Sequence, residues 1–171
     1  MSIEITTTAR DLQDLLDERA IRDVIHRYAR GVDRLDWELV RSCFHADAKL
    51  TYGQAQTPEE FIAGASRGLQ LYALTQHAVT NITIEVSGDT AHSESYCLAR
   101  HRTRGTDGAP DNDFLWGGRY VDRHERRAGE WRIASRICIH EWTKIETVEA
   151  VWPAAGAFTQ GQRSRDDVSY R

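Results

Sequence analysis

The chain has 171 residues, enough for one domain with its own core, and its 40% hydrophobic and 28% charged residues are typical of globular proteins. Its net charge of -4 and its scattered basic residues exclude the positive surface of a nucleic-acid-binding protein. No apolar run is long enough to span a bilayer, and the first residues, MSIEITTTAR, lack the basic-then-apolar order of a signal peptide. We therefore expect a cytoplasmic protein that binds neither nucleic acid nor membranes.

The first half of the chain is predicted to be mostly helical. Thr8 can cap a helix that begins at Ala9 and continues as one long helix or two short ones. Apolar residues then recur at the three- and four-residue steps of one helix face: Ile21, Val24, Ile25, Tyr28, Ala29 and Val32. A second helix is expected at 37–44 and a short strand at 48–52. The run TPEE, beginning at Thr57, predicts a third helix to about residue 72.

The second half changes to the two-residue period of strands. Four long strands are expected, at 77–86, 90–104, 114–127 and 131–146. Helices followed by a meander of antiparallel strands indicate an α+β fold, in which the helices pack on one face of a curved sheet. Such a sheet forms a cone whose open end suits an apolar ligand. Residues 1–150 are expected to form this single domain, and 151–171 a tail that covers the pocket or contacts a neighbouring subunit.

Asp33 lies at the end of the apolar row of the long helix. A carboxylate near a buried stripe is costly unless it has a partner or a task, so this position suggests a functional site. Alternatively Asp33, like Asp36, caps the helix at 37–44, because aspartate is favoured at helix starts. Caps are commoner than catalytic carboxylates, and from these residues alone both interpretations stay open.

Motifs narrow the chemistry further. The chain lacks the H-E-x-x-H, P-loop, G-x-S-x-G and G-x-G-x-x-G signatures, so any catalysis is expected to be acid–base work without a metal or cofactor. His77 opens the first long strand. Three other histidines are expected to be exposed: His26, His45 and His124. Three widely spaced cysteines indicate neither a disulfide framework nor a metal site and are expected in the core or pocket wall: Cys43, Cys97 and Cys138.

The last strand has two faces of different character. Strict alternation puts Arg136 and His140 on a face that mixes charge with an aromatic side chain, and Ile133 and Ile137 on an apolar face. The mixed face is either solvated, as most charged residues are, or lines a binding site. The alternation by itself does not choose between the two.

Five segments, in their order and spacing, carry a family resemblance: ERAIRDVIHRYARGVDRLDW, AKLTYG, PEEF, TQHAVTN and GEWRIASR. Over residues 17–142 the chain resembles the SnoaL-like branch of the nuclear-transport-factor-2-like superfamily. That branch includes scytalone dehydratase, bile-acid 7α-dehydratase and hexachlorocyclohexane dehydrochlorinase. The resemblance implies a cone-shaped α+β fold with a deep pocket, and a homo-oligomer with a trimer favoured.

The resemblance also assigns site residues. Asp33 matches the buried carboxylate of the family and His77 the histidine that it orients, which together form a His-Asp dyad. Tyr28 stands where the bile-acid enzyme has a tyrosine, and Tyr52 where scytalone dehydratase has a pocket tyrosine. Arg136 matches a pocket arginine of the dehydrochlorinase.

Further positions extend or limit the match. His140 falls near an arginine of the bile-acid enzyme, and Trp116 and Tyr96 complete the predicted substrate-binding set. The dehydrochlorinase has a lysine at the position of Tyr28, so the tyrosine here weakens a dehalogenation interpretation. Gly117 takes the place assigned to the second pocket histidine of scytalone dehydratase, so we do not expect the substrate of that enzyme.

The predicted function is that of a cofactor-independent lyase acting on a bulky, mostly apolar cyclic or aromatic substrate. His77 would take a proton from carbon while Asp33 orients its ring, the two tyrosines would donate hydrogen bonds, and Arg136 or His140 would assist the leaving group. The same groups fit an isomerase or a polyketide-type cyclase, since carbon deprotonation is the shared step. The rival from another class is a non-catalytic small-molecule-binding module or a dioxygenase β-type subunit.

Overall fold

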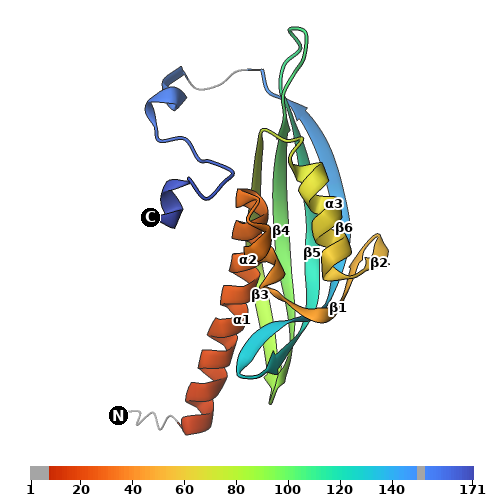
Figure 1. The fold of residues 1–171 in the computed structure, drawn as a ribbon, viewed down its shortest axis with the longest axis vertical. Helices are drawn as coiled ribbons and strands as arrows, with labels where there is room; N and C mark the ends of the chain where they lie inside the picture. The colour runs from red at the N-terminus through yellow and green to blue at the C-terminus, as the bar shows by residue number, and fades with distance from the viewer. Residues whose placement is uncertain (1–7, 150–152) are drawn as a thin grey trace, which may run out of the picture.

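A six-stranded sheet bends around three helices in the computed structural model, which describes residues 8–149 and 153–171 (Figure 1). The helices are α1 (Ala9–Arg34), α2 (Trp37–Arg41) and α3 (Pro58–Leu69). The strands are β1 (Phe44–Tyr52), β2 (Gln54–Gln56), β3 (Leu74–Ser87), β4 (Thr90–Thr103), β5 (Asn112–Arg127) and β6 (Glu130–Thr147). All three helices lie on the concave face of the unclosed sheet, so the predicted α+β class is confirmed.

Helix α1 is one continuous helix of 26 residues, and its predicted apolar face packs on the sheet. Thr8 and Asp11 form a capping box at its start, which supplies partners for backbone groups that the first turn leaves unpaired. The cap of α2 is Asp36, whose side chain accepts a hydrogen bond from the backbone N–H of Leu39 at 3.1 Å. Asp33 lies within α1 and caps no helix, so the capping interpretation of Asp33 is wrong.

The strand order is β2-β1-β6-β5-β4-β3. Strands β3 to β6 form the predicted antiparallel meander, but β1 pairs with β6 in parallel, which corrects the expectation of a purely antiparallel sheet. Strand β6 is an edge strand of the meander. Strand β1 pairs along its free edge, from Phe44 opposite Ile133 to Thr51 opposite Ile137. The short strand β2, missing from the predicted elements, turns back on β1 through Gly53, which has a positive φ of 78°.

A β-bulge in β6 changes which residues face the helices. The register between β5 and β6 shifts so that His124 faces Ile133 while Arg123 faces Ser135. Arg136 therefore points into the fold and is fully buried, whereas Ile137 points outward and is 51% exposed. The strict alternation expected for this strand is wrong beyond Ile133, because the bulge inserts one residue that opposes none.

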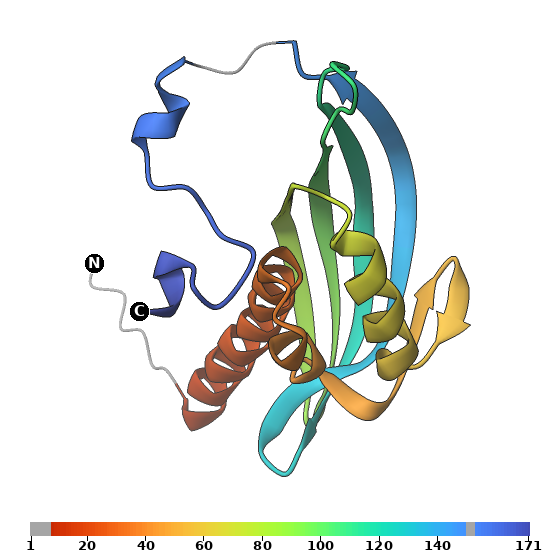
Figure 2. The ribbon, with the colours of Figure 1, turned by 45° about the horizontal axis from the view of Figure 1, so that its top comes forward.

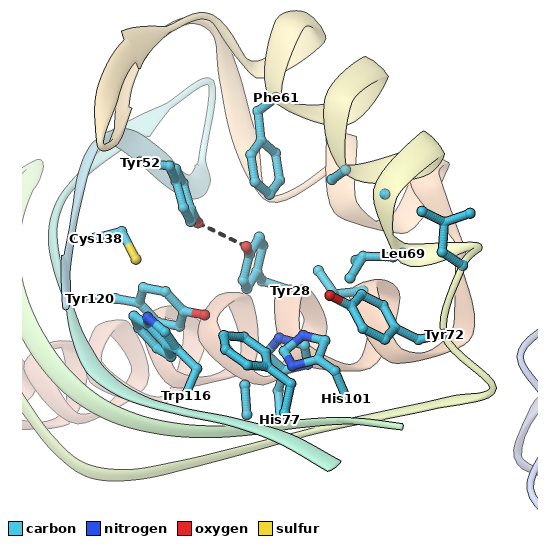
Figure 3. A pocket seen from close by; sticks show the side chains of 16 residues that line it. Tyr28, Tyr52, Phe61, Leu69, Tyr72, His77, His101, Trp116, Tyr120 and Cys138 are labelled. Atoms are coloured by element: carbon cyan, nitrogen blue, oxygen red, sulfur yellow. Dashed lines mark hydrogen bonds between the residues drawn. The ribbon is translucent and has the colours of Figure 1, made fainter. Parts of the chain in front are cut away.

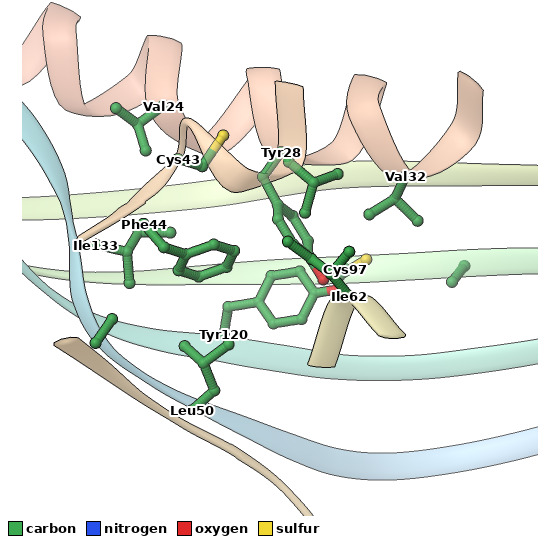
Figure 4. Close-up of a cluster of buried hydrophobic side chains, with 13 residues drawn as sticks. Val24, Tyr28, Val32, Cys43, Phe44, Leu50, Ile62, Cys97, Tyr120 and Ile133 are labelled. Carbon is green, nitrogen blue, oxygen red and sulfur yellow. The ribbon is translucent and has the colours of Figure 1, made fainter. Parts of the chain in front are cut away.

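The hydrophobic core fills the space between α1 and the concave face (Figure 4). Cys43 and Cys97 are buried in it as predicted. His26 is exposed as expected, but His45 and His124 are only 7% and 0% exposed, which corrects the prediction for those two. His124 is on an inward-facing position of β5, and its ring nitrogen Nε2 lies 2.9 Å from the Ser93 hydroxyl.

The tail residues 153–171 run back to α1 (Figure 2). Arg30 donates a hydrogen bond to the carbonyl of Ser169 at 2.8 Å, and Arg165 pairs with Asp36 at 3.2 Å. Arg163 donates to the backbone carbonyls of Leu69 and Tyr72, in the turn between α3 and β3. Among the described residues, no helix combines the length and apolar character needed to cross a membrane.

Candidate active site

A cavity of about 440 Å³ lies between α1, α3 and the concave face of the sheet (Figure 3). Its walls are mostly rings, from Tyr28 of α1, Tyr52 of β1, Phe61 of α3, and Trp116 and Tyr120 of β5. Among the described residues that line it, none is an aspartate, glutamate, lysine or arginine. Such a lining favours an uncharged ligand with one or more rings, because a charged ligand would lose its hydration without a compensating partner.

His77 and Asp33, 44 residues apart in the chain, meet at the wall of this cavity. The Nδ1 atom of His77 lies 2.7 Å from Oδ1 of Asp33, and the backbone N–H of His77 donates to Oδ2 of the same carboxylate at 2.9 Å. The two side chains are 9% and 14% exposed. Because both carboxylate oxygens bind one residue, ring and backbone are fixed together.

Asp33 is held as a carboxylate. Burial raises its pKa, but the hydrogen bonds and the charge interaction with His77 outweigh burial, so the pKa lies below its ordinary value. An ionised carboxylate only accepts hydrogen bonds, so it selects the tautomer in which Nδ1 of His77 carries the hydrogen. Nε2 is then left with a free lone pair, which is the state of a proton acceptor.

Tyr28 and Tyr52 place two hydroxyl groups on the cavity wall, 2.8 Å from each other. Burial raises the pKa of Tyr52 to about 12, and burial followed by the neighbouring Tyr52 raises that of Tyr28 well above its usual value. Both therefore remain protonated hydrogen-bond donors near neutral pH. Arg136 lies behind them and donates from Nη1 to the Tyr52 hydroxyl at 3.3 Å.

His101 of β4 is a pocket residue that the sequence interpretation missed. Its ring lies 5.4 Å from that of His77, at an interplanar angle of 88°, and it lines the same cavity. Its Nδ1 atom is buried without a hydrogen-bond partner among the described residues. Burial, and then the nearby His77, lower its pKa to about 4, so this histidine is neutral at neutral pH. The alternation of Cys97, Ala99 and His101 on the inward face of β4 could have revealed it.

Gly117 had been assigned the place of a second pocket histidine. The structure puts that glycine under the indole ring of Trp142, where an added Cβ would approach ring atoms to within 2.3 Å. The cavity nevertheless contains a second histidine, His101, from a different strand.

Two predicted substrate contacts lie away from the cavity. Tyr96 is 44% exposed on the outer face of the sheet, because its neighbours Cys97 and Ala99 take the alternate, inward positions of β4. His140 is exposed, and it follows the last pair that β6 makes with β1, between Thr51 and Ile137. Trp116, also predicted to bind substrate, lines the cavity. Within the part of the chain that the structure describes, no three metal-binding side chains gather.

The sequence profile of the family described as SnoaL-like domain matches residues 13–137. No curated protein matches the sequence.

Solved structures share the fold. A putative scytalone dehydratase from Novosphingobium aromaticivorans has a TM-score of 0.67 and 26% identity, over 83% of this chain and 95% of that chain. The hexachlorocyclohexane dehydrochlorinase LinA-type3 from Novosphingobium barchaimii has a TM-score of 0.70 and 21% identity, over 84% and 99%. The Kfla4162 protein from Kribbella flavida has a TM-score of 0.70 and 21% identity, over 77% and 95%.

Proposed function

This chain belongs to the SnoaL-like domain family, and on that premise we propose that it is a cofactor-independent lyase. The substrate class is a bulky, uncharged cyclic or aromatic compound, and the reaction removes a small group from it. The observation that carries the proposal is the hydrogen bond between Asp33 and His77 at the wall of an aromatic cavity. The dehydratase and dehydrochlorinase among the structural neighbours also support elimination chemistry.

His77 is the general base of the proposed reaction. Its Nε2 lone pair takes a proton from a carbon atom next to a carbonyl or aryl group, and the electron pair of the C–H bond passes to that group. Asp33 keeps the ring in the required tautomer and stabilises the imidazolium that forms, as buried carboxylates do in hydrolase triads. Such general base catalysis is typically worth roughly 10²–10⁴-fold.

The hydroxyls of Tyr28 and Tyr52 receive the charge that develops on the substrate oxygen. Fixed donors in a cavity that excludes water need no reorganisation when that charge forms. His101 is neutral and close to His77, so its ring N–H can donate a hydrogen bond to the departing hydroxyl group. As the C–O bond breaks, the electron pair returns from the substrate oxygen to form the C=C bond. The hydroxide takes the proton from the His77 imidazolium, so water leaves and His77 is neutral again. In this scheme Arg136, being fully buried, contacts the tyrosines and not the leaving group.

The test is elimination by variants of the dyad, on a panel of neutral cyclic β-hydroxy ketones that form a conjugated product. Asp33→Asn and His77→Ala are expected to lower the rate by about 10²-fold or more, since the oriented base is lost. Matched controls are Asp47→Asn and His92→Ala, whose side chains are exposed and do not line the cavity. The proposal falls if both dyad variants fold and eliminate as fast as the parent.

The same panel separates the alternatives. An isomerase would return rearranged ketones without loss of water, and a polyketide-type cyclase would close rings on linear poly-ketones, both in a manner that depends on His77. A binding module or dioxygenase β-type subunit would bind ligands with no turnover. Cytoplasmic location and a homo-oligomer, a trimer by family resemblance, stay predictions, and sedimentation velocity checks the second.

A further inference from the structure

A buried ion pair stands behind the tyrosine hydroxyls. Arg136 binds Asp122 through two parallel hydrogen bonds, from Nε to Oδ1 at 2.7 Å and from Nη2 to Oδ2 at 2.6 Å. Neither side chain has any exposed surface. The guanidinium group also lies between two rings, with its central carbon 4.2 Å from the ring centres of Tyr28 and Tyr120.

This arrangement is poorly explained by stability alone. Burying two charges costs desolvation energy that their attraction only partly returns, and apolar side chains of similar volume often serve folding as well or better. Apolar and aromatic side chains make up most of the surrounding core, with His124 close by, its Nε2 4.0 Å from Oδ2 of Asp122. The pair therefore calls for a role beyond holding the sheet together.

The direction of the hydrogen bonds suggests that role. Asp122 uses two of the N–H directions of Arg136, and Nη1 is left to donate to the hydroxyl oxygen of Tyr52. Arginine has no acceptor, so Tyr52 must accept in this bond. The two tyrosines share one further hydrogen bond, which uses one of their two hydroxyl hydrogens. Whichever of them donates, one O–H remains for a ligand in the cavity.

Asp122 also limits how Arg136 can act. Because the pair is neutral overall, its field fades quickly with distance, and the arginine reaches the cavity mainly through the hydroxyl that it touches. A chain of hydrogen bonds that begins at a cation polarises each successive O–H and makes the last one a stronger donor.

We infer that Arg136, held by Asp122, is a positioning residue that acts through Tyr52 and turns the Tyr28–Tyr52 pair into a site for a substrate oxyanion. The inference rests on the proposed function, since it assigns the oxyanion to the carbonyl or phenol oxygen of that substrate. It adds Asp122, which no sequence pattern had indicated, to the residues on which the site depends.

The experiment uses para-nitrophenol as a stand-in for the oxyanion, because its bound phenol and phenolate forms have different absorption spectra. The full chain is titrated with the probe, and the ratio of bound phenolate to bound phenol is read at several pH values. Tyr52→Phe and the paired variant Asp122→Leu/Arg136→Met are each expected to lower the phenolate preference by about tenfold, the effect of one hydrogen bond to a charged group. Combining all three substitutions should give no further loss.

A matched control removes another ion pair. Arg119 and Glu141 pair on the outer surface, and Glu141→Leu/Arg119→Met should leave the probe spectrum unchanged. If the paired core variant does not fold, Arg136→Lys replaces it, since lysine keeps the charge but cannot bind Asp122 with two nitrogens and donate to Tyr52 as well. Circular dichroism and thermal melts establish that each variant is folded.

The outcomes are distinct. An unchanged phenolate preference in the paired variant or in Arg136→Lys overturns the inference, as do effects of Tyr52→Phe and the paired variant that add in full. Failure of the phenolate to bind the parent protein overturns it too. His77→Ala should keep the phenolate preference while abolishing elimination, so the proposed lyase activity can fail without the oxyanion site failing, and the reverse.

Discussion

At the scale of single residues, His101 beside His77 and His124 near Asp122 differ in pKa from solvent-exposed histidines. Burial lowers the pKa of His124 to about 4, and it lowers that of His101 to a similar value with His77 as the second cause. Both rings are therefore neutral at neutral pH, and both must be protonated when the chain unfolds in mild acid. Because of these depressed pKa values, the free energy of unfolding depends on pH.

The sign of this link gives a prediction for His124. The unfolded chain takes up the proton near the ordinary pKa of 6.5 and the folded chain only near 4, so stability is complete above 6.5 and is lost as the pH falls toward 4. The free energy of unfolding should fall by on the order of 3 kcal/mol for this residue over that window. Urea titrations of His124→Gln should show a flatter profile, and His140→Gln, an exposed control, should not. An equal slope in His124→Gln and the parent contradicts the prediction.

Residue by residue, sequence reasoning named several residues of the candidate site. The structure brings Asp33 and His77 together as the family resemblance implied, and with them Tyr28, Tyr52 and Trp116. Asp122 was not foreseen, because nothing in a sequence marks which carboxylate will pair with a buried arginine 14 residues away.

At the scale of elements, the bulge in β6 decides which side chains of that strand point toward the helices. Hydrophobic periodicity predicted helices, strands and most faces correctly, since the period of two holds along β4 and along β3 on either side of a register shift between Thr80 and Thr83. It failed in β6 because one inserted residue exchanges the faces beyond it, and the insertion depends on the partner strand β5. Arg136 reaches the tyrosines for this reason.

Two identical substitutions on either side of the bulge test this assignment. Ile133→Ala removes a fully buried side chain and is expected to cost about 2–5 kcal/mol of unfolding free energy. Ile137→Ala, at a position 51% exposed, should cost less than about 1 kcal/mol. Strict alternation would put both isoleucines on one face and give similar costs, so equal values from denaturant titrations would contradict the register described.

At the scale of the whole molecule, the tail is joined to the rim of the cavity. Arg163 donates to the carbonyls of Leu69 and Tyr72 at 2.8 and 2.5 Å, and to the Thr75 hydroxyl at 3.3 Å. Leu69 and Tyr72 both line the cavity. These contacts were beyond sequence reasoning, which could foresee a separate tail from its composition but not the residue that anchors it.

Arg163→Ala should therefore loosen the rim. Losing hydrogen bonds from a charged donor to partly buried carbonyls is expected to speed amide hydrogen exchange at 70–75 by about tenfold or more. Arg67→Ala, on the exposed surface of α3, serves as the control and should leave that exchange unchanged. The rim does not depend on the tail if both variants exchange at the rate of the parent.

The central claim is that His77, oriented by Asp33, takes a proton from carbon inside the cavity. The most direct measurement is deuterium uptake from heavy water into the acidic C–H position of a bound neutral cyclic ketone, followed by mass spectrometry. We expect the parent and His92→Ala to catalyse uptake, and His77→Ala to slow it by about 10²-fold or more. Uptake by His77→Ala at the parental rate, in a variant shown to be folded, would contradict the account.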